Sequence, residues 1–92
     1  MKEPLSDIEI QRRLGSLPAW SRKGDVLTKT FQFRDFTGSM ELVNNIARVA
    51  ERANHHPDID IRYNKVIVSL TTHDAGGITK KDLDLATEIE AL

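Results

Sequence analysis

The chain has 92 residues, with 13 Lys and Arg against 14 Asp and Glu, and it contains three His and no Cys. The length suits one domain spanning residues 1–92. The balance of mixed charges argues against nucleic acid or an anionic membrane as the main partner. The lack of cysteine excludes thiol chemistry and zinc sites made of cysteines. Since no stretch approaches about 18 apolar residues and the start lacks the apolar run of a secretory signal, we expect a cytoplasmic protein.

The first predicted element is a helix that follows Ser6 and ends near Gly15. Ser6 and Glu9 have the spacing of a capping box, in which each residue satisfies a backbone N–H of the other. Further along, β-branched and aromatic residues alternate after the turn sequence RKGD. This pattern predicts a hairpin between residues 20–22 and 26–33.

A second, longer helix is predicted over residues 38–53. Its apolar stripe is expected to consist of Met40, Val43, Ala47 and Ala50, with Ile46 and Ala53 alongside. Asn54 readily takes the left-handed conformation that closes a helix, and Pro57 disfavours helical geometry in the residue before it. The adjacent histidines at positions 55 and 56 therefore start the loop that leaves the helix.

Two strands are predicted next, over residues 58–63 and 65–71, with a tight reversal at Asn64. Thr79 can then cap a last helix, which completes the order helix-strand-strand-helix-strand-strand-helix. Hairpin connections make a sheet antiparallel, and helices of these lengths can shield one of its faces. The predicted fold is therefore α+β, with a four-stranded antiparallel sheet and three helices packed on one face.

All three histidines, His55, His56 and His73, fall at the ends of predicted elements, where sites are usually built. Glu51 precedes His55 by four residues, so a continuous helix would place the carboxylate where it could orient that imidazole. His73 leaves the strand that pairs with the one starting at Asp58, so the hairpin would bring it near the histidine pair. Imidazole exchanges protons near neutral pH, which favours acid-base chemistry.

Other interpretations remain open for each position by itself. A metal is not expected, because adjacent histidines in extended chain point apart and there is no His-Glu-x-x-His helix. The pair His55-His56 is as compatible with a solvated helix end as with a site, and Asp82 is typical of a helix cap. Trp20 and Tyr63 have the character of core or rim aromatics.

In combination, these residues resemble the pterin-4a-carbinolamine dehydratases, which are also known for a dimerisation-cofactor role in animals. The family pattern is an acidic or polar residue, three residues, His-His-Pro, a short gap, an aromatic, nine residues, His, a gap and Asp. The matching positions here are Glu51, His55, His56, Pro57, Tyr63, His73 and Asp82. The stretch YNKVIVSLTTHDAGGITKKDLDLA is also similar to the family's strand and last helix.

The resemblance implies a hydro-lyase that converts 4a-hydroxytetrahydrobiopterin into quinonoid dihydrobiopterin and water, in the recycling of the pterin used by aromatic amino acid hydroxylases. It makes all three histidines catalytic: His55 and His73 as acid-base groups, and His56 as the group that holds the pterin and shares in proton transfer. It makes Glu51 a residue that orients the cluster or binds the pterin, and it makes Asp82 a substrate-binding residue that supports His73 or the site wall. Further wall residues would be Trp20, Tyr63 and Lys81. No metal or organic cofactor is implied, since the pterin is the substrate.

Two departures from animal members indicate a microbial-type protein: Lys81 replaces an arginine, and the sequence PDI replaces PEW. The family forms homodimers, often paired into homotetramers, and the apolar helix at 38–53 is consistent with a further buried surface. The alternative function is a non-catalytic adaptor of the coactivator type, or a factor in another pterin pathway. An adaptor would not need the three histidines and Glu51 around one cavity.

Overall fold

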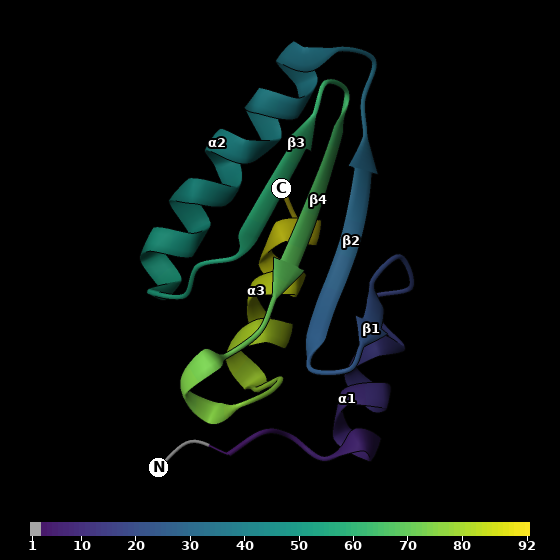
Figure 1. Cartoon of the computed structure of the whole chain (residues 1–92), viewed down its shortest axis with the longest axis vertical. Helices are drawn as coiled ribbons and strands as arrows, with labels where there is room; N and C mark the ends of the chain where they lie inside the picture. The colour runs from purple at the N-terminus through teal and green to yellow at the C-terminus, as the bar shows by residue number, and fades with distance from the viewer. Residues whose placement is uncertain (1–2) are drawn as a thin grey trace.

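The computed structural model describes residues 3–92, and its helices and strands follow in the predicted order (Figure 1). They are α1 (Asp7–Leu14), β1 (Ser21–Lys23), β2 (Val26–Gln32), α2 (Phe36–Ala53), β3 (Asp58–Arg62), β4 (Lys65–Leu70), the 3-10 turn η1 (His73–Ala75) and α3 (Lys80–Glu90). The strands form one antiparallel sheet in the order β1-β2-β4-β3. The predicted α+β fold is confirmed.

The core lies on one face of the sheet. Leu27 on β2 pairs with Leu70 on β4, and both are fully buried, as are Val66 and Val68 on the same face. These side chains pack against residues of all three helices: Ile10 of α1, Ile46 and Val49 of α2, and Leu83, Leu85, Ala86 and Ile89 of α3. The helices therefore cover a single face. None of the helices described is long and apolar enough to cross a membrane.

The first helix begins as predicted. The side chain of Ser6 accepts a hydrogen bond from the Glu9 N–H at 3.2 Å, and the Glu9 carboxylate accepts one from the Ser6 N–H at 3.0 Å. Gly15 closes the helix. The helix is tied to α3 by Arg13, whose guanidinium donates to Asp84 at 3.0 Å.

The second helix begins at Phe36, two residues earlier than predicted, because the Asp35 side chain accepts a hydrogen bond from the Gly38 N–H at 3.0 Å. Its buried side chains are Ser39, Ile46, Val49 and Ala50. The predicted stripe is therefore partly wrong, because Ala47 is exposed and Met40 and Val43 are only half-buried. Position 39 faces inward because the Ser39 hydroxyl donates to the carbonyl of Tyr63 at 2.7 Å.

The two ends of the β3–β4 hairpin have different surroundings. Tyr63 has a φ of 49° and lies in the turn, so β3 ends at Arg62 and not at Tyr63 as predicted. At the other end of the hairpin, Asp58 pairs with Ser69. The chain enters β3 at this end directly from the end of α2 (Figure 1). All three histidines lie at this end, between α2, β4 and the start of α3.

Candidate active site

The end of α2 decides where the histidine pair points. Asn54 takes the predicted left-handed conformation, with φ 50° and ψ 42°. Its N–H donates to the carbonyl of Glu51 at 3.2 Å, and the N–H of His55 donates to the carbonyl of Ala50 at 3.1 Å. These two bonds form a Schellman motif, which turns the chain away from the helix axis. His55 therefore leaves the helical register.

Glu51 pairs with the second histidine. Its Oε2 lies 2.5 Å from Nε2 of His56, and both side chains are exposed to solvent. The prediction that Glu51 orients His55 is wrong, because the i and i+4 relation holds only while the helix continues. The left-handed Asn54 interrupts it one residue before His55.

The first histidine pairs instead with Asp82, in the first turn of α3. Nε2 of His55 lies 2.5 Å from Oδ1 of Asp82, and the exposed fractions of the two side chains are 11% and 0%. Asp82 also completes a capping box with Thr79, so the interpretation as a cap is confirmed. The prediction that Asp82 supports His73 is corrected, because the hydrogen bond of its carboxylate to a histidine goes to His55.

Two further donors reach the Asp82 carboxylate. Its Oδ2 accepts from the Thr72 hydroxyl at 2.8 Å and from the Thr79 N–H at 2.9 Å. An ionised carboxylate can only accept hydrogen bonds, so beside ionised Asp82 it is Nε2 of His55 that carries the hydrogen of their bond. The Nδ1 atom of His55 is then the one that can take up or release a proton.

His73 lies in a short loop that is closed by hydrogen bonds. Thr72 and Gly77 form an isolated bridge, with the Thr72 N–H donating to the Gly77 carbonyl at 3.0 Å. Between them, η1 carries His73, and Gly76 takes a left-handed φ of 72°. The predicted convergence of the three histidines is confirmed, since they share a cavity of about 390 Å³. Its lining consists of Asn54, His55, His56, Thr71, Thr72, His73, Asp74 and Lys81.

The remaining predicted residues are divided between this cavity and other places. Lys81 lines it, whereas Glu51 is outside its lining and reaches it through His56. Trp20 is buried in the core, where its indole N–H donates to Glu90 at 2.8 Å. Tyr63 is 65% exposed and lies in the turn at the opposite end of the hairpin (Figure 1).

Four residues that line the cavity had no predicted role in the site: Asn54, Thr71, Thr72 and Asp74. Among them, Thr72 has a side chain that bonds to Asp82. A signal for it exists, because Val66, Val68, Leu70 and Thr72 continue one inward-facing alternation. A polar side chain that follows three core positions must find a buried partner. The identity of that partner, ten residues further on, is not visible in the alternation.

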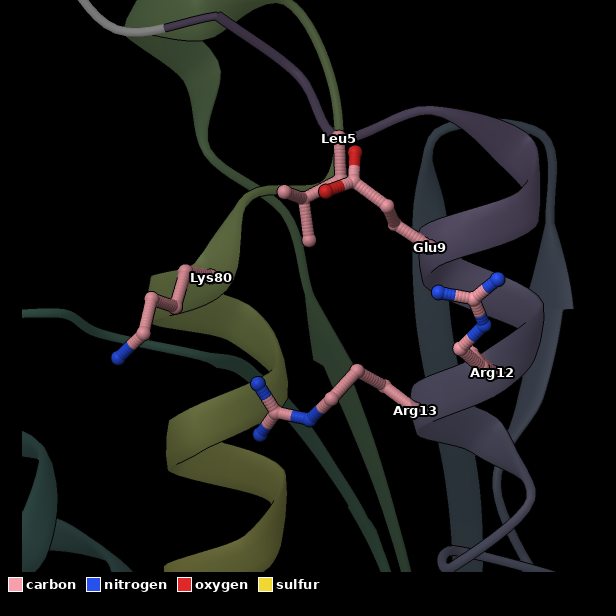
Figure 2. A pocket seen from close by; sticks show the side chains of 5 residues that line it. All are labelled: Leu5, Glu9, Arg12, Arg13 and Lys80. Atoms are coloured by element: carbon pink, nitrogen blue, oxygen red, sulfur yellow. The ribbon is translucent and has the colours of Figure 1, made fainter.

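A second hollow, of about 450 Å³, lies between α1 and the start of α3. Figure 2 shows its lining side chains, Leu5, Glu9, Arg12, Arg13 and Lys80. Its charges serve the fold: Lys80 and Arg13 both donate to Asp84, and the Lys80 hydrogen bond, followed by that of Arg13, holds the pKa of Asp84 below its ordinary value. The histidine cavity is therefore the better candidate for proton transfer. Among residues 3–92, no group of three His, Cys, Asp or Glu side chains is placed to hold a metal ion.

The sequence is similar to those of several known proteins. The model of the family described as "Pterin 4 alpha carbinolamine dehydratase" matches residues 3–92. A protein of Roseiflexus sp. (strain RS-1) is 55% identical over 92 residues, which is 100% of this chain and 99% of the relative. One of Thermosynechococcus vestitus is 52% identical over 100% of this chain and 97% of the relative. Both carry the name "Putative pterin-4-alpha-carbinolamine dehydratase".

Two solved structures are also similar. A "transcriptional coactivator/pterin dehydratase" from Brucella melitensis superposes with a TM-score of 0.92 at 31% identity, covering 97% of each chain. A pterin dehydratase-like protein described as a RuBisCO assembly factor in the alpha-carboxysome superposes with a TM-score of 0.63 at 20% identity, over 78% of this chain and 83% of the other. The second likeness shows the fold alone.

Proposed function

The chain belongs to the pterin 4 alpha carbinolamine dehydratase family, and on this premise we propose that it dehydrates 4a-hydroxytetrahydrobiopterin to quinonoid dihydrobiopterin and water. The observation that carries the proposal is the single cavity shared by three histidines, one of them held by a buried carboxylate. Its supporting argument is chemical: this arrangement supplies both a proton donor and a proton acceptor near neutral pH.

The reaction requires two proton movements. The bond between the 4a carbon and its hydroxyl oxygen breaks, and the oxygen takes up a proton and leaves as water. The adjacent ring nitrogen loses its proton and forms a double bond to the 4a carbon. No electrons are gained or lost overall, so an acid and a base suffice, and we propose no cofactor besides the pterin substrate.

We assign these roles to His55 and His73. Asp82 fixes the Nε2–H form of His55, which leaves Nδ1 to exchange a proton with the substrate. His73, on the η1 loop, lines the same cavity and supplies the second group. Asp82 itself is fully buried, so the substrate-binding role first predicted for it becomes one of positioning His55.

The exposed pair has a different role. His56 lines the cavity, and Glu51 holds its imidazole from outside the lining. We propose that His56 binds the pterin with help from Glu51 and shares in proton transfer. Lys81 forms part of the wall.

The test is the turnover of purified protein with enzymatically generated 4a-hydroxytetrahydropterin. Wild type should accelerate dehydration, and His55→Ala and His73→Ala should each lower kcat by roughly 10² or more, as expected for loss of a general acid or base. His56→Ala should act more strongly on KM. Unchanged kcat in both of the first two variants would contradict the assigned roles.

A second candidate function is the non-catalytic adaptor. It is favoured by the description of the Brucella melitensis structure, which names a transcriptional coactivator together with a pterin dehydratase. The clustering of the three histidines argues for catalysis, because an adaptor would not require it. An inactive but folded wild-type protein would leave the adaptor as the remaining candidate.

Three further expectations stay predictions: a homodimer or homotetramer, a functional link to an aromatic amino acid hydroxylase, and a cytoplasmic location.

A further inference from the structure

We propose that Thr72 is a positioning residue for the reaction: its hydroxyl orients the Asp82 carboxylate, which in turn holds His55. The inference rests on the proposed function for its catalytic consequence. Its structural part, the control of the His55 ring by Thr72, can be tested independently. No part of the family pattern quoted above includes this position.

The burial of Thr72 requires the hydroxyl to have a partner. Thr72 is 4% exposed and continues the core-facing side of β4 after Leu70. A buried hydroxyl without a hydrogen bond costs about 1 to 3 kcal/mol, so threonine in place of valine at this position indicates a specific use. The partners are Asp82 and Thr79, both buried.

The directions of these hydrogen bonds follow from chemistry. A carboxylate cannot donate, so the hydrogen of the Thr72 hydroxyl points to Asp82. The contact of 2.8 Å between the two threonine hydroxyls must then use the hydrogen of Thr79. Thr79 still has lone pairs to accept from the Lys81 N–H at 3.3 Å. The series of hydrogen bonds therefore runs from the Thr79 hydroxyl to the Thr72 hydroxyl and from there to the Asp82 carboxylate, and the direction of donation at both hydroxyls is fixed.

This series of hydrogen bonds fixes which oxygen of the Asp82 carboxylate faces the imidazole of His55. Oδ2 of Asp82 is occupied by Thr72 and by the Thr79 N–H, and Oδ1 is left for His55. Without the Thr72 hydroxyl, Oδ2 keeps one donor and the carboxylate can rotate about its last bond. His55 would then lose the fixed acceptor that selects its Nε2–H form.

Thr72 also anchors the other acid-base histidine. Its backbone N–H and carbonyl bond to Gly77 at 3.0 and 3.3 Å, and these bonds close the loop that carries His73. One residue thus acts on both halves of the proposed acid-base pair: its hydroxyl bonds to the carboxylate that holds His55, and its backbone closes the loop that carries His73. Substitution of the side chain tests the first half and leaves the backbone bonds in place.

The experiment compares Thr72→Val, which has the same shape without a hydroxyl, with Thr72→Ser, which keeps the hydroxyl. We expect Thr72→Val to lower kcat by roughly 10- to 100-fold with a smaller change in KM, as for other losses of positioning hydrogen bonds. Thr72→Ser should restore most of kcat. In ¹⁵N spectra of the imidazoles, His55 should show a dominant Nε2–H form in wild type and Thr72→Ser, and a mixture in Thr72→Val.

The matched control is Thr28→Val, the same chemical change on β2, on the face of the sheet opposite to buried Leu27, where the hydroxyl accepts from that of Ser69 at 3.4 Å. It should leave kcat and the His55 spectrum unchanged. Wild-type kcat and a wild-type His55 spectrum in folded Thr72→Val would overturn the proposal. If Thr72→Val does not fold, Thr72→Cys, a weaker donor, takes its place with the same two outcomes. If wild type has no dehydratase activity, the proposed function fails, and the spectrum still decides whether Thr72 controls His55.

Discussion

His55 and His56 are neighbours in the chain, but their imidazoles lie in opposite surroundings. The side chain of His55 is 11% exposed and bonds to a fully buried carboxylate, whereas that of His56 is 57% exposed and bonds to a carboxylate that is 77% exposed. Water and salt weaken the second pair, so it can exchange partners with a ligand. The first pair is protected from water and keeps its geometry. This difference supports a fixed acid-base role for His55 and a binding role for His56.

At the scale of single residues, we expect Asp82→Asn to lower kcat by roughly 10² or more. An asparagine that accepts from Thr72 and Thr79 with its oxygen presents its NH₂ group to His55, and this favours the wrong tautomer of the ring, as in the aspartate of catalytic triads. Steady-state kinetics measure the effect. The matched control is Glu51→Gln, an exposed carboxylate beside the neighbouring histidine, which should change KM more than kcat. Equal effects of the two substitutions on kcat would contradict the distinction between the histidines.

At the scale of elements, the site is formed where helices and strands begin or end. The Schellman motif closes α2 before His55, the capping box of Thr79 and Asp82 starts α3, and the bridge between Thr72 and Gly77 closes the loop of His73. Each device satisfies backbone groups that a helix or strand end leaves free. The first and third bring His55 and His73 to the cavity, and the second places buried Asp82 against His55. The fold and the site therefore use the same local hydrogen bonds.

The left-handed residue at the end of α2 gives a prediction at the scale of elements. Asn54→Val should lower the free energy of unfolding by about 1 to 2 kcal/mol, because a β-branched residue is strained at φ 50°. Asn54→Gly should leave it unchanged within about 0.5 kcal/mol or raise it, since glycine suits this conformation. Urea unfolding measures both. A tolerated valine would show that the helix can end in another way.

The comparison of these elements shows what a sequence can reveal. The capping box of Ser6 and the left-handed Asn54 were predictable, because both depend on residues within one turn of each other. The predicted pairing of Glu51 with His55 was wrong, because the left-handed Asn54 ends the helix and with it the i, i+4 relation between the two residues. The contact between His55 and Asp82 joins residues 27 apart and depends on how α3 packs, which periodicity does not describe.

At the scale of the whole molecule, the site lies at one end of an elongated body of about 39 by 24 by 20 Å. Three segments meet there, the end of α2, the end of β4 and the start of α3, and hydrogen bonds join α3 to the other two. The buried polar side chains of this end border a core that is otherwise apolar. A ligand in the cavity would contact all three segments at once.

Ligand binding should therefore stabilise the fold as a whole. A stable oxidised pterin at about 100 times its Kd should add about 2.7 kcal/mol and raise Tm by about 10 °C or more for a domain of this size. Thermal unfolding followed by circular dichroism measures the shift. His56→Ala should reduce it at the same pterin concentration, and an unrelated aromatic heterocycle serves as the negative control. An absent shift at saturating pterin would contradict the location of the site.

The position of Asp82 in the last helix has a consequence for biosynthesis. All three histidines precede the carboxylate in the chain, so a growing polypeptide presents its imidazoles well before the group that orients one of them. The nascent protein cannot acquire an ordered site until α3 has left the ribosome and docked onto the sheet. The proposed catalytic arrangement and the completed fold thus arise together, and a partly synthesised chain would lack both.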